Sequence, residues 1–463
     1  MLLYYNTGDE NLKNASVLMT EGGVYSRIVR FAIPIFWGNL FQQLYNVVDS
    51  LVLGNFGGAN ALAAISATSS LIFLMVGFFD GMFMGVGVVI SRYFGAGDEE
   101  NVGKAIQSAV VFGIMAGLTL TVLGLLFTPF LLQLMGTPPE AMEGAVTYVR
   151  IYFGGILTLS LFNTANGIFS AVGDSRHPLY YLVISSVLNV VLDLILVIVF
   201  DMGIGGTAIA TVISQGVSAM LAFIKLTTVK DVHRVHFKNM HADVSIIKEF
   251  LHLGVPSGIQ NSVISIANVF VQANINSFGA AAVAGCGAHS KIGGFVFIPI
   301  TSFSVSMTTF IGQNLGAKQY DRAKKGSRFA IVVSALLAEG IGVFYFIFAP
   351  QIISLFGNDP QVIAFGVAQA RVCALFYFLL AFSHSVAGIL RGAGKSTVPM
   401  VVMLMCWCVI RVTYITIVTH FFKNIEFVFW AYPLTWFLSS ALFLIYYIKS
   451  DWIHGFDNYN PNK

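Results

Sequence analysis

The chain has 463 residues, of which 56% are hydrophobic and only 10% are charged, and its mean hydropathy is +0.79. This composition excludes a soluble globular protein and indicates one that crosses a lipid bilayer many times. The formal net charge of +3 is small, and it gives no reason to expect a nucleic-acid partner. The polar residues 1–23 show no removable signal peptide, and the four cysteines all fall in apolar stretches, where neither disulfides nor a metal site is expected.

Apolar stretches of twenty or more residues recur along almost the whole chain, and each can cross a hydrocarbon core of about 30 Å. The pattern predicts an all-α polytopic membrane protein with no strands in its spanning part. We predict twelve membrane-spanning helices, at 28–53, 61–90, 105–128, 146–171, 179–200, 207–228, 254–277, 285–311, 328–350, 370–391, 398–421 and 427–448.

Most of the 25 Lys and Arg residues fall in alternate loops, which the positive-inside rule assigns to the cytoplasm. We therefore expect a multi-pass membrane protein with both termini in the cytoplasm. The longest polar break separates the sixth and seventh helices. The predicted division is a cytoplasmic N-terminal segment (1–27), a first six-helix bundle (28–228), a cytoplasmic linker (229–249), a second bundle (250–448) and a cytoplasmic tail (449–463).

The second half repeats the first. Pro34 and Gly57 match Pro256 and Gly279 at a shift of 222 residues. At a shift of 221, the matching pairs are Gly95 and Gly316, Lys104 and Lys325, Arg150 and Arg371, Gly167 and Gly388, Gly173 and Gly394, and Pro178 and Pro399. So constant a shift predicts two homologous six-helix bundles of parallel topology, related by an axis along the membrane normal, with a substrate route between them.

The first predicted helix has a polar face that ends in a carboxylate. Asn39, Gln42, Asn46 and Asp49 follow one another at spacings of three, four and three residues, which places them on one side of the helix. An acidic residue inside a bilayer costs about 2.5–3.5 kcal/mol, so Asp49 must face a partner, a cavity or an ion.

The fifth predicted helix supplies a second carboxylate, Asp193, on the same face as Ser186 and Asn189. The sixth aligns four hydroxyl groups, those of Thr207, Thr211, Ser214 and Ser218. Oxygen ligands of this kind suit a hard cation such as Na⁺, although hydroxyl groups can also merely join neighbouring helices. Two neighbouring carboxylates do not both ionise cheaply in a low dielectric, so one of them should hold a proton or share a cation.

The second half repeats the polar face but not its charge. Asn261, Ser265, Asn268 and Gln272 share one side of the seventh helix, whereas Val271 replaces Asp49 and Tyr414 replaces Asp193. Gln42, Asn46, Asn261 and Asn268 are therefore predicted cavity residues. Asp80, Glu339 and His384 are candidates for a cavity or relay role, with a structural ion pair as the alternative. Lys291, Arg411 and again His384 are candidate counter-charges within the second bundle.

The pattern as a whole resembles the multidrug and toxic compound extrusion (MATE) transporters. The residues that carry the resemblance are Pro34, Gln42, Gln43, Asp49, Gly54, Gly57, Ala61, Leu62 and Ala63, with SRYFGAGD, its echo GQNLGAK, NVVLDLILV and GIGGTAIAT. The resemblance implies an antiporter that exchanges Na⁺ or H⁺ for organic, often cationic, compounds. It carries the cation site onto Asp49, Asn189, Asp193 and Thr211. Because the seventh and tenth helices lack an acidic residue, the chain is more similar to DinF-type than to NorM-type members.

Two alternatives belong to other functional classes. A lipid-linked saccharide flippase of the same superfamily would be expected to line its cleft with several arginines, whereas Arg411 is the only one near mid-span. An integral-membrane enzyme would need reactive residues clustered at the membrane surface, and the loop with His233, His236 and His241 is more simply a basic linker. We therefore expect a monomeric transporter, not an enzyme. Its partners would be a small organic substrate and the bilayer, with no cofactor besides the coupling ion.

Overall fold

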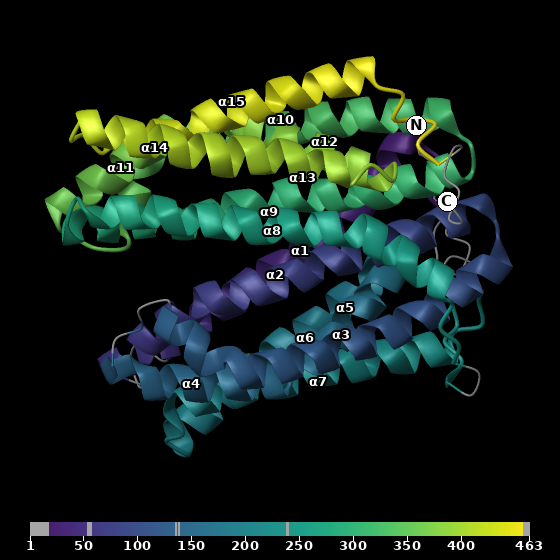
Figure 1. Ribbon diagram of the computed structural model, residues 1–463, viewed down its shortest axis with the longest axis horizontal. Helices are drawn as coiled ribbons and strands as arrows, with labels where there is room; N and C mark the ends of the chain where they lie inside the picture. The colour runs from purple at the N-terminus through teal and green to yellow at the C-terminus, as the bar shows by residue number, and fades with distance from the viewer. Residues whose placement is uncertain (1–17, 53–57, 135–136, 138, 238–239, 457–463) are drawn as a thin grey trace, which may run out of the picture.

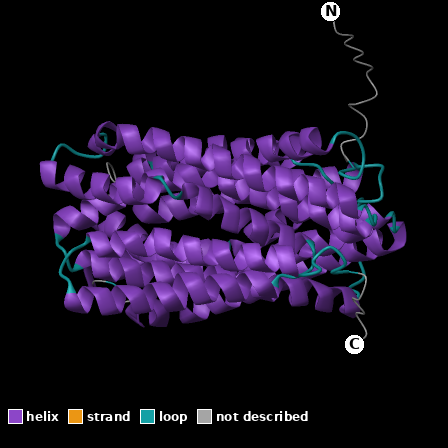
Figure 2. Ribbon diagram, turned by 90° about the horizontal axis from the view of Figure 1, so that it is seen from above, coloured by secondary structure: helices purple, strands orange, loops and turns teal. Residues whose placement is uncertain are grey.

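A computed structural model describes residues 18–52, 58–134, 137, 139–237 and 240–456. Every regular element in these ranges is a helix, and the helices run side by side along the long axis of the molecule (Figure 2). The all-α prediction is confirmed. Gly54, Gly57 and the side chains of Ala61, Leu62 and Ala63 lie outside the described residues, as do parts of the predicted terminal segments.

The first half contains seven α-helices and one π-helical segment. They are α1 (Val24–Val52), α2 (Gly58–Ala96), α3 (Glu99–Leu134), α4 (Pro139–Gly154), α5 (Ile156–Ala171), α6 (Arg176–Asp193), the π-helix η3 (Leu194–Val199) and α7 (Gly203–Thr228). The second half follows the same plan. Its elements are α8 (Val244–Asn276), α9 (Ala280–Gly316), α10 (Tyr320–Ser354), α11 (Pro360–Ala374), α12 (Tyr377–Gly392), α13 (Thr397–Met403), the π-helix η5 (Leu404–Ile410), α14 (Arg411–Phe421) and α15 (Glu426–Lys449).

Two groups of helices make up the molecule. Figure 1 shows α8 to α15 in its upper part and α3 to α7 in its lower part. Eight of the described spans are long and apolar enough to cross a membrane, and two bent pairs bring the number to ten. The remaining two helices, α1 and α8, have 29 and 33 residues, or about 43 and 50 Å, and carry the predicted polar faces. The twelve-span architecture is thus complete.

Two of the predicted spans are bent rather than continuous. The fourth breaks between α4 and α5 by 48°, and the tenth breaks between α11 and α12 by 55°. At the first break, a Cβ added to Gly155 would lie 2.2 Å from Val212, so only glycine allows α7 to approach. At the second, Glu339 Oε2 accepts a hydrogen bond of 3.2 Å from the backbone N–H of Phe378, which satisfies a donor in the first turn of α12.

The first helix of each half begins in the core of the other half. Ile28 and Phe31 of α1 are buried in one hydrophobic cluster with side chains of α9 to α13, η5 and α15. Ile246 and Phe250 of α8 are buried among side chains of α2, α3, α5 and α7. The repeats are therefore separate in sequence but interlocked in packing.

The two halves meet most closely where α2 crosses α8. A Cβ added to Gly81 would lie 2.2 Å from the backbone nitrogen of Gly258, and one added to Gly85 would lie 2.5 Å from the carbonyl oxygen of Phe250. Small residues allow this approach of two backbones. Asn261 Nδ2 donates a hydrogen bond of 3.1 Å to the carbonyl oxygen of Gly77. One residue of the polar face predicted on α8 therefore joins the two halves.

Candidate cation site and closure of the inner end

The two predicted carboxylates meet inside the first half. Asp49, near the end of α1, lies close enough to Asp193, the last residue of α6, for the two carboxyl groups to interact directly. Asp193 is 0% exposed. Both of its carboxylate oxygens, and Oδ1 of Asp49, are buried and accept no hydrogen bond from the part of the chain that the structure describes. The helix turns from α to π directly after Asp193, a distortion that is frequent at functional sites.

Helices α6 and α7 complete the group of oxygen atoms. Asn189 Nδ2 lies 3.5 Å from Thr211 Oγ1, and Thr211 Oγ1 donates a hydrogen bond of 3.0 Å to the carbonyl oxygen of Thr207. Asn189 Oδ1 and Thr207 Oγ1 are themselves buried without a partner among the described residues. The structure thus brings Asp49, Asn189, Asp193 and Thr211 together from three helices.

This arrangement suits a bound cation. Buried oxygen atoms that accept no hydrogen bond cost about 1–3 kcal/mol each, and more where they carry charge. A proton shared between the carboxyl groups, or a Na⁺ ion held by carboxylate, amide and hydroxyl oxygens, would remove that cost.

Sequence reasoning missed a row of tyrosines beside the carboxylates. Tyr45 of α1 and Tyr148 of α4 both lie near Asp49. Tyr148 stacks on Tyr152, with ring centroids 6.3 Å apart and an interplanar angle of 18°. The signal was present, because residues four apart share a helix face, but aromatic side chains are common in membrane spans for other reasons.

The structure also shows the surroundings of the other predicted polar residues of the first half. Asp80 of α2 accepts a hydrogen bond of 2.7 Å from Asn163 Nδ2 of α5 and forms no ion pair with any described basic residue. Gln42 and Asn46 are exposed on α1, and Gln42 approaches the hydroxyl group of Tyr45.

In the second half, the positions equivalent to the carboxylates are apolar or aromatic. Val271 is buried in a hydrophobic cluster against which Tyr414 packs. Asn268 is exposed on α8. The ring of His384 packs edge-on against Phe297 and Trp407, with centroids 4.8 and 5.4 Å apart.

One buried charge of the second half is positive and belongs to Arg411. It is 2% exposed, and its Nε and Nη2 atoms donate to Thr435 Oγ1 at 3.2 and 2.8 Å. Its guanidinium carbon lies 4.7 Å from the ring centroid of Tyr432 and 5.5 Å from that of Trp407. No described carboxylate pairs with it, and the other predicted counter-charge, Lys291, is exposed.

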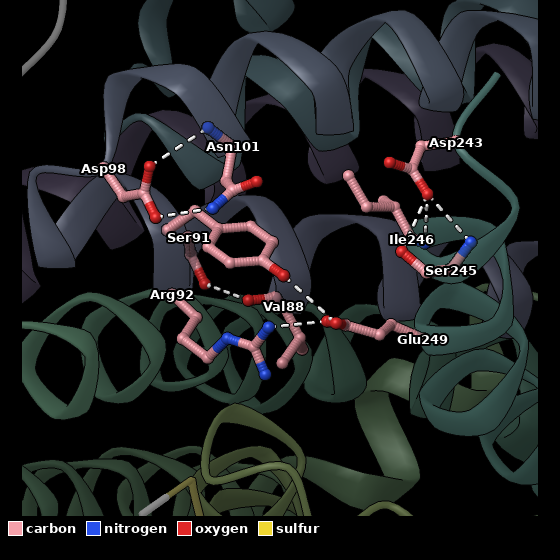
Figure 3. Close-up of polar contacts among 10 residues, drawn as sticks. Val88, Ser91, Arg92, Asp98, Asn101, Asp243, Ser245, Ile246 and Glu249 are labelled. Atoms are coloured by element: carbon pink, nitrogen blue, oxygen red, sulfur yellow. Dashed lines mark hydrogen bonds and ion pairs between the residues drawn. The ribbon is translucent and has the colours of Figure 1, made fainter. Parts of the chain in front are cut away.

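An ion pair ties the two halves together where α2 ends and α8 begins. Arg92 Nη2 of α2 lies 2.5 Å from Glu249 Oε2 of α8, and the hydroxyl group of Tyr93 donates to Glu249 Oε1 at 3.0 Å (Figure 3). Glu249 is 2% exposed. The ring of Phe456, from the end of the chain, lies 5.1 Å from the Arg92 guanidinium. We call this group the inner clasp, because the orientation predicted from the Lys and Arg residues puts this end on the cytoplasmic side.

Two interlocked six-helix repeats, with buried carboxylates in one of them and an ion pair that joins their ends, are features of a membrane transporter. The chain belongs to the MatE family, whose model matches it twice, over residues 34–195 and 256–417. These two matches are offset by 222 residues, the shift found in the repeat. The resemblance to MATE transporters is thereby confirmed, and the chain is a transporter rather than an enzyme.

Curated relatives and solved structures agree with this assignment. The chain is 26% identical to the probable multidrug resistance protein YoeA of Bacillus subtilis, over 92% of this chain and 94% of YoeA. It is 29% identical to the probable multidrug resistance protein YpnP of the same organism, over 85% and 88%. A solved outward-facing multidrug resistance MATE family transporter matches with a TM-score of 0.88 and 23% identity, over 94% of this chain and 98% of that one, and shows the same fold. These relatives do not favour the flippase alternative.

Proposed function

We propose that this protein is an antiporter that exchanges H⁺ or Na⁺ for organic, cationic or amphipathic compounds and exports them by alternating access. The observation that carries the proposal is Asp193, whose two buried carboxylate oxygens accept no hydrogen bond from the described residues while Asp49 lies beside them. Such a pair binds a cation readily and releases it when the surroundings change. The multidrug export proteins among the relatives support the class of cargo.

The packing of α1 gives a route from ion binding to movement of the bundles. Asp49 at one end of α1 belongs to the cation site, and Ile28 and Phe31 at the other end are buried in the core of the second half. A cation that pulls Asp49 and Asp193 together therefore acts on a helix anchored in both halves. It shifts the equilibrium between outward- and inward-open states only by its difference in affinity for the two.

The remaining assignments are part of the same proposal. The cation site consists of Asp49, Asn189, Asp193 and Thr211, and Gln42, Asn46, Asn261 and Asn268 line the cargo route. The protein acts as a monomer in the bacterial plasma membrane, with both termini in the cytoplasm. The distribution of Lys and Arg and the bacterial origin of the relatives support this placement.

The test is dye efflux from proteoliposomes under separately imposed H⁺ and Na⁺ gradients. Wild-type protein should drive efflux under at least one gradient. Asp49→Asn and Asp193→Asn should lower efflux to the rate of empty liposomes, because a neutral amide does not exchange a cation. Asp98→Asn, the same change at a surface carboxylate that bonds Asn101, is the matched control and should transport at the wild-type rate. Full transport by both site variants, or efflux under neither gradient, would contradict the proposal.

A further inference from the structure

A third carboxylate lies in the interior of the first half, at another depth than the first two. Asp49 is three residues from the outer end of α1. Asp80 is sixteen residues, or about 24 Å, from the inner end of α2. Asp80 therefore lies between the cation site and the inner clasp formed by Arg92 and Glu249.

Two tyrosines of α4 connect these carboxylates. Tyr148 lies near both Asp49 and Asp193. Tyr152, one turn further in, stacks on Tyr148 and lies near Asp80, and its hydroxyl group is within reach of Gln215 of α7. The groups follow one another inward through the bundle, from the carboxylate pair past the two stacked tyrosine rings to Asp80.

We propose that Asp80 is the inner station of a proton relay that starts at Asp49 and Asp193 and runs through the hydroxyl groups of Tyr148 and Tyr152. This inference rests on the proposed antiport function and names its coupling ion as the proton. In each step, a hydroxyl group accepts the incoming proton and passes on its own, so both tyrosines end unchanged. The carboxylate pair loses one proton and Asp80 gains one.

The chemistry of the path fits a proton better than Na⁺. Hydroxyl groups both donate and accept hydrogen bonds, whereas a dehydrated Na⁺ ion needs several oxygen ligands at every stop. The titratable groups that act on the three carboxylates from the neighbouring helices are the carboxylates themselves and Tyr45, Tyr148 and Tyr152. Among the described residues, no Lys, Arg or His forms an ion pair with any of the three.

The position of Asp80 also links its charge to the contact between the halves. Gly77 and Gly81 flank Asp80 on α2, and both face α8. The carbonyl oxygen of Gly77 accepts a hydrogen bond from Asn261, and Gly81 lies against the backbone of Gly258. Asn163 Nδ2 holds the Asp80 carboxylate from the opposite side at 2.7 Å. A proton that arrives at Asp80 thus changes the charge in the turn of α2 where the two halves touch.

The experiment records proton entry with a pH-sensitive dye inside proteoliposomes while cargo leaves. Asp80→Asn should lower cargo-coupled proton entry at least about tenfold, since a positioned acid–base group is typically worth that much or more. Asp80→Glu should restore it. Tyr152→Phe keeps the ring packing and should lower proton entry to a similar extent, and Tyr181→Phe, a tyrosine outside the path, should have no effect. Cargo affinity in detergent should stay within about twofold of wild type in all four variants, because none of these groups is placed in the cargo route.

Difference infrared spectroscopy gives a second readout, the protonation of the Asp80 carboxyl group. A merely structural role of Asp80 would not change it. A carboxyl band should appear as cargo binds, and it should be absent in Asp80→Asn but present in Asn166→Ala, an amide on the same helix as Asn163.

Wild-type proton entry in Asp80→Asn and Tyr152→Phe would overturn the relay, as would efflux driven by Na⁺ alone. If wild type drives efflux and Asp193→Asn does not while Asp80→Asn does, only the relay fails. If wild type drives none, the antiport function fails first.

Discussion

The two halves share a fold but not a charge. In the first half, the carboxyl groups of Asp49, Asp193 and Asp80 lie within the helix bundle, and none of them forms an ion pair with a described basic residue. In the second, Arg411 is buried with no described carboxylate partner and is held by Thr435 and two aromatic rings. The two halves therefore share a scaffold and differ in their buried charge, with carboxylates in the first and the Arg411 guanidinium in the second.

The two halves also differ in whether their buried charged groups have hydrogen-bond partners. The Arg411 guanidinium donates hydrogen bonds to the Thr435 hydroxyl group and packs over the rings of Tyr432 and Trp407. These contacts stabilise its charge within the protein. Asp193 has two buried oxygens that accept nothing from the described residues. A group with all its partners in place holds structure, whereas one with unused acceptors can exchange a ligand, and for this reason we propose ion coupling in the first half.

The inner clasp gives the largest effect expected outside the cation site, because it joins the halves. Glu249→Gln removes the negative charge that pairs with Arg92, and breaking a buried pair costs about 3–5 kcal/mol. We expect a spin label pair placed on the inner ends of α2 and α9 to show a larger population of separated distances. The exchanged pair Arg92→Glu with Glu249→Arg should restore closure. A distance distribution unchanged by Glu249→Gln would show that the glycine contacts between α2 and α8 alone hold the end shut.

Arg411 tests whether the second half contributes charge or only structure. Arg411→Met keeps most of the side-chain volume and removes a buried charge, so we expect a change in stability within about 1.5 kcal/mol. Thermal unfolding in detergent measures it, and gradient-driven dye efflux should stay at the wild-type rate. Loss of driven efflux from a folded Arg411→Met protein would place part of the coupling in the second half.

The smallest effect is expected at Asp243, the residue before α8. Its side chain accepts hydrogen bonds from Ser245 and from the backbone N–H groups of Ser245 and Ile246 (Figure 3). Asp243→Ala should cost about 1 kcal/mol, as for other helix N-caps. The hydrogen bonds from Ser245 lower the pKa of the Asp243 carboxyl. Its contribution is therefore present above the usual pKa of about 4 and is lost as the pH falls through the lowered value. A thermal-unfolding difference between wild type and Asp243→Ala that stays constant from pH 7 down to pH 3 would contradict this role.

The sequence predicted the carboxylate pair because charged residues are rare inside membrane spans and because spacings of three and four residues define a helix face. The repeat added that Val271 and Tyr414 replace the charges. Tyr148 and Tyr152 were missed, since aromatic residues in spans are commonly packing residues. The cap that Glu339 provides for α12 depends on a bend that periodicity does not reveal. The inner clasp joins residues 157 positions apart, and no local pattern identifies such a pair.

The most direct test of the central claim is ion release from the purified protein in weakly buffered detergent solution when cargo is added. Wild-type protein should release protons, because cargo and cation favour opposite states of the two bundles. Asp193→Asn should release none, and Glu339→Gln, a carboxylate of the second half that caps α12, should release as many as wild type. Release that survives Asp193→Asn, or that disappears in Glu339→Gln, would contradict the assignment of ion coupling to the first half.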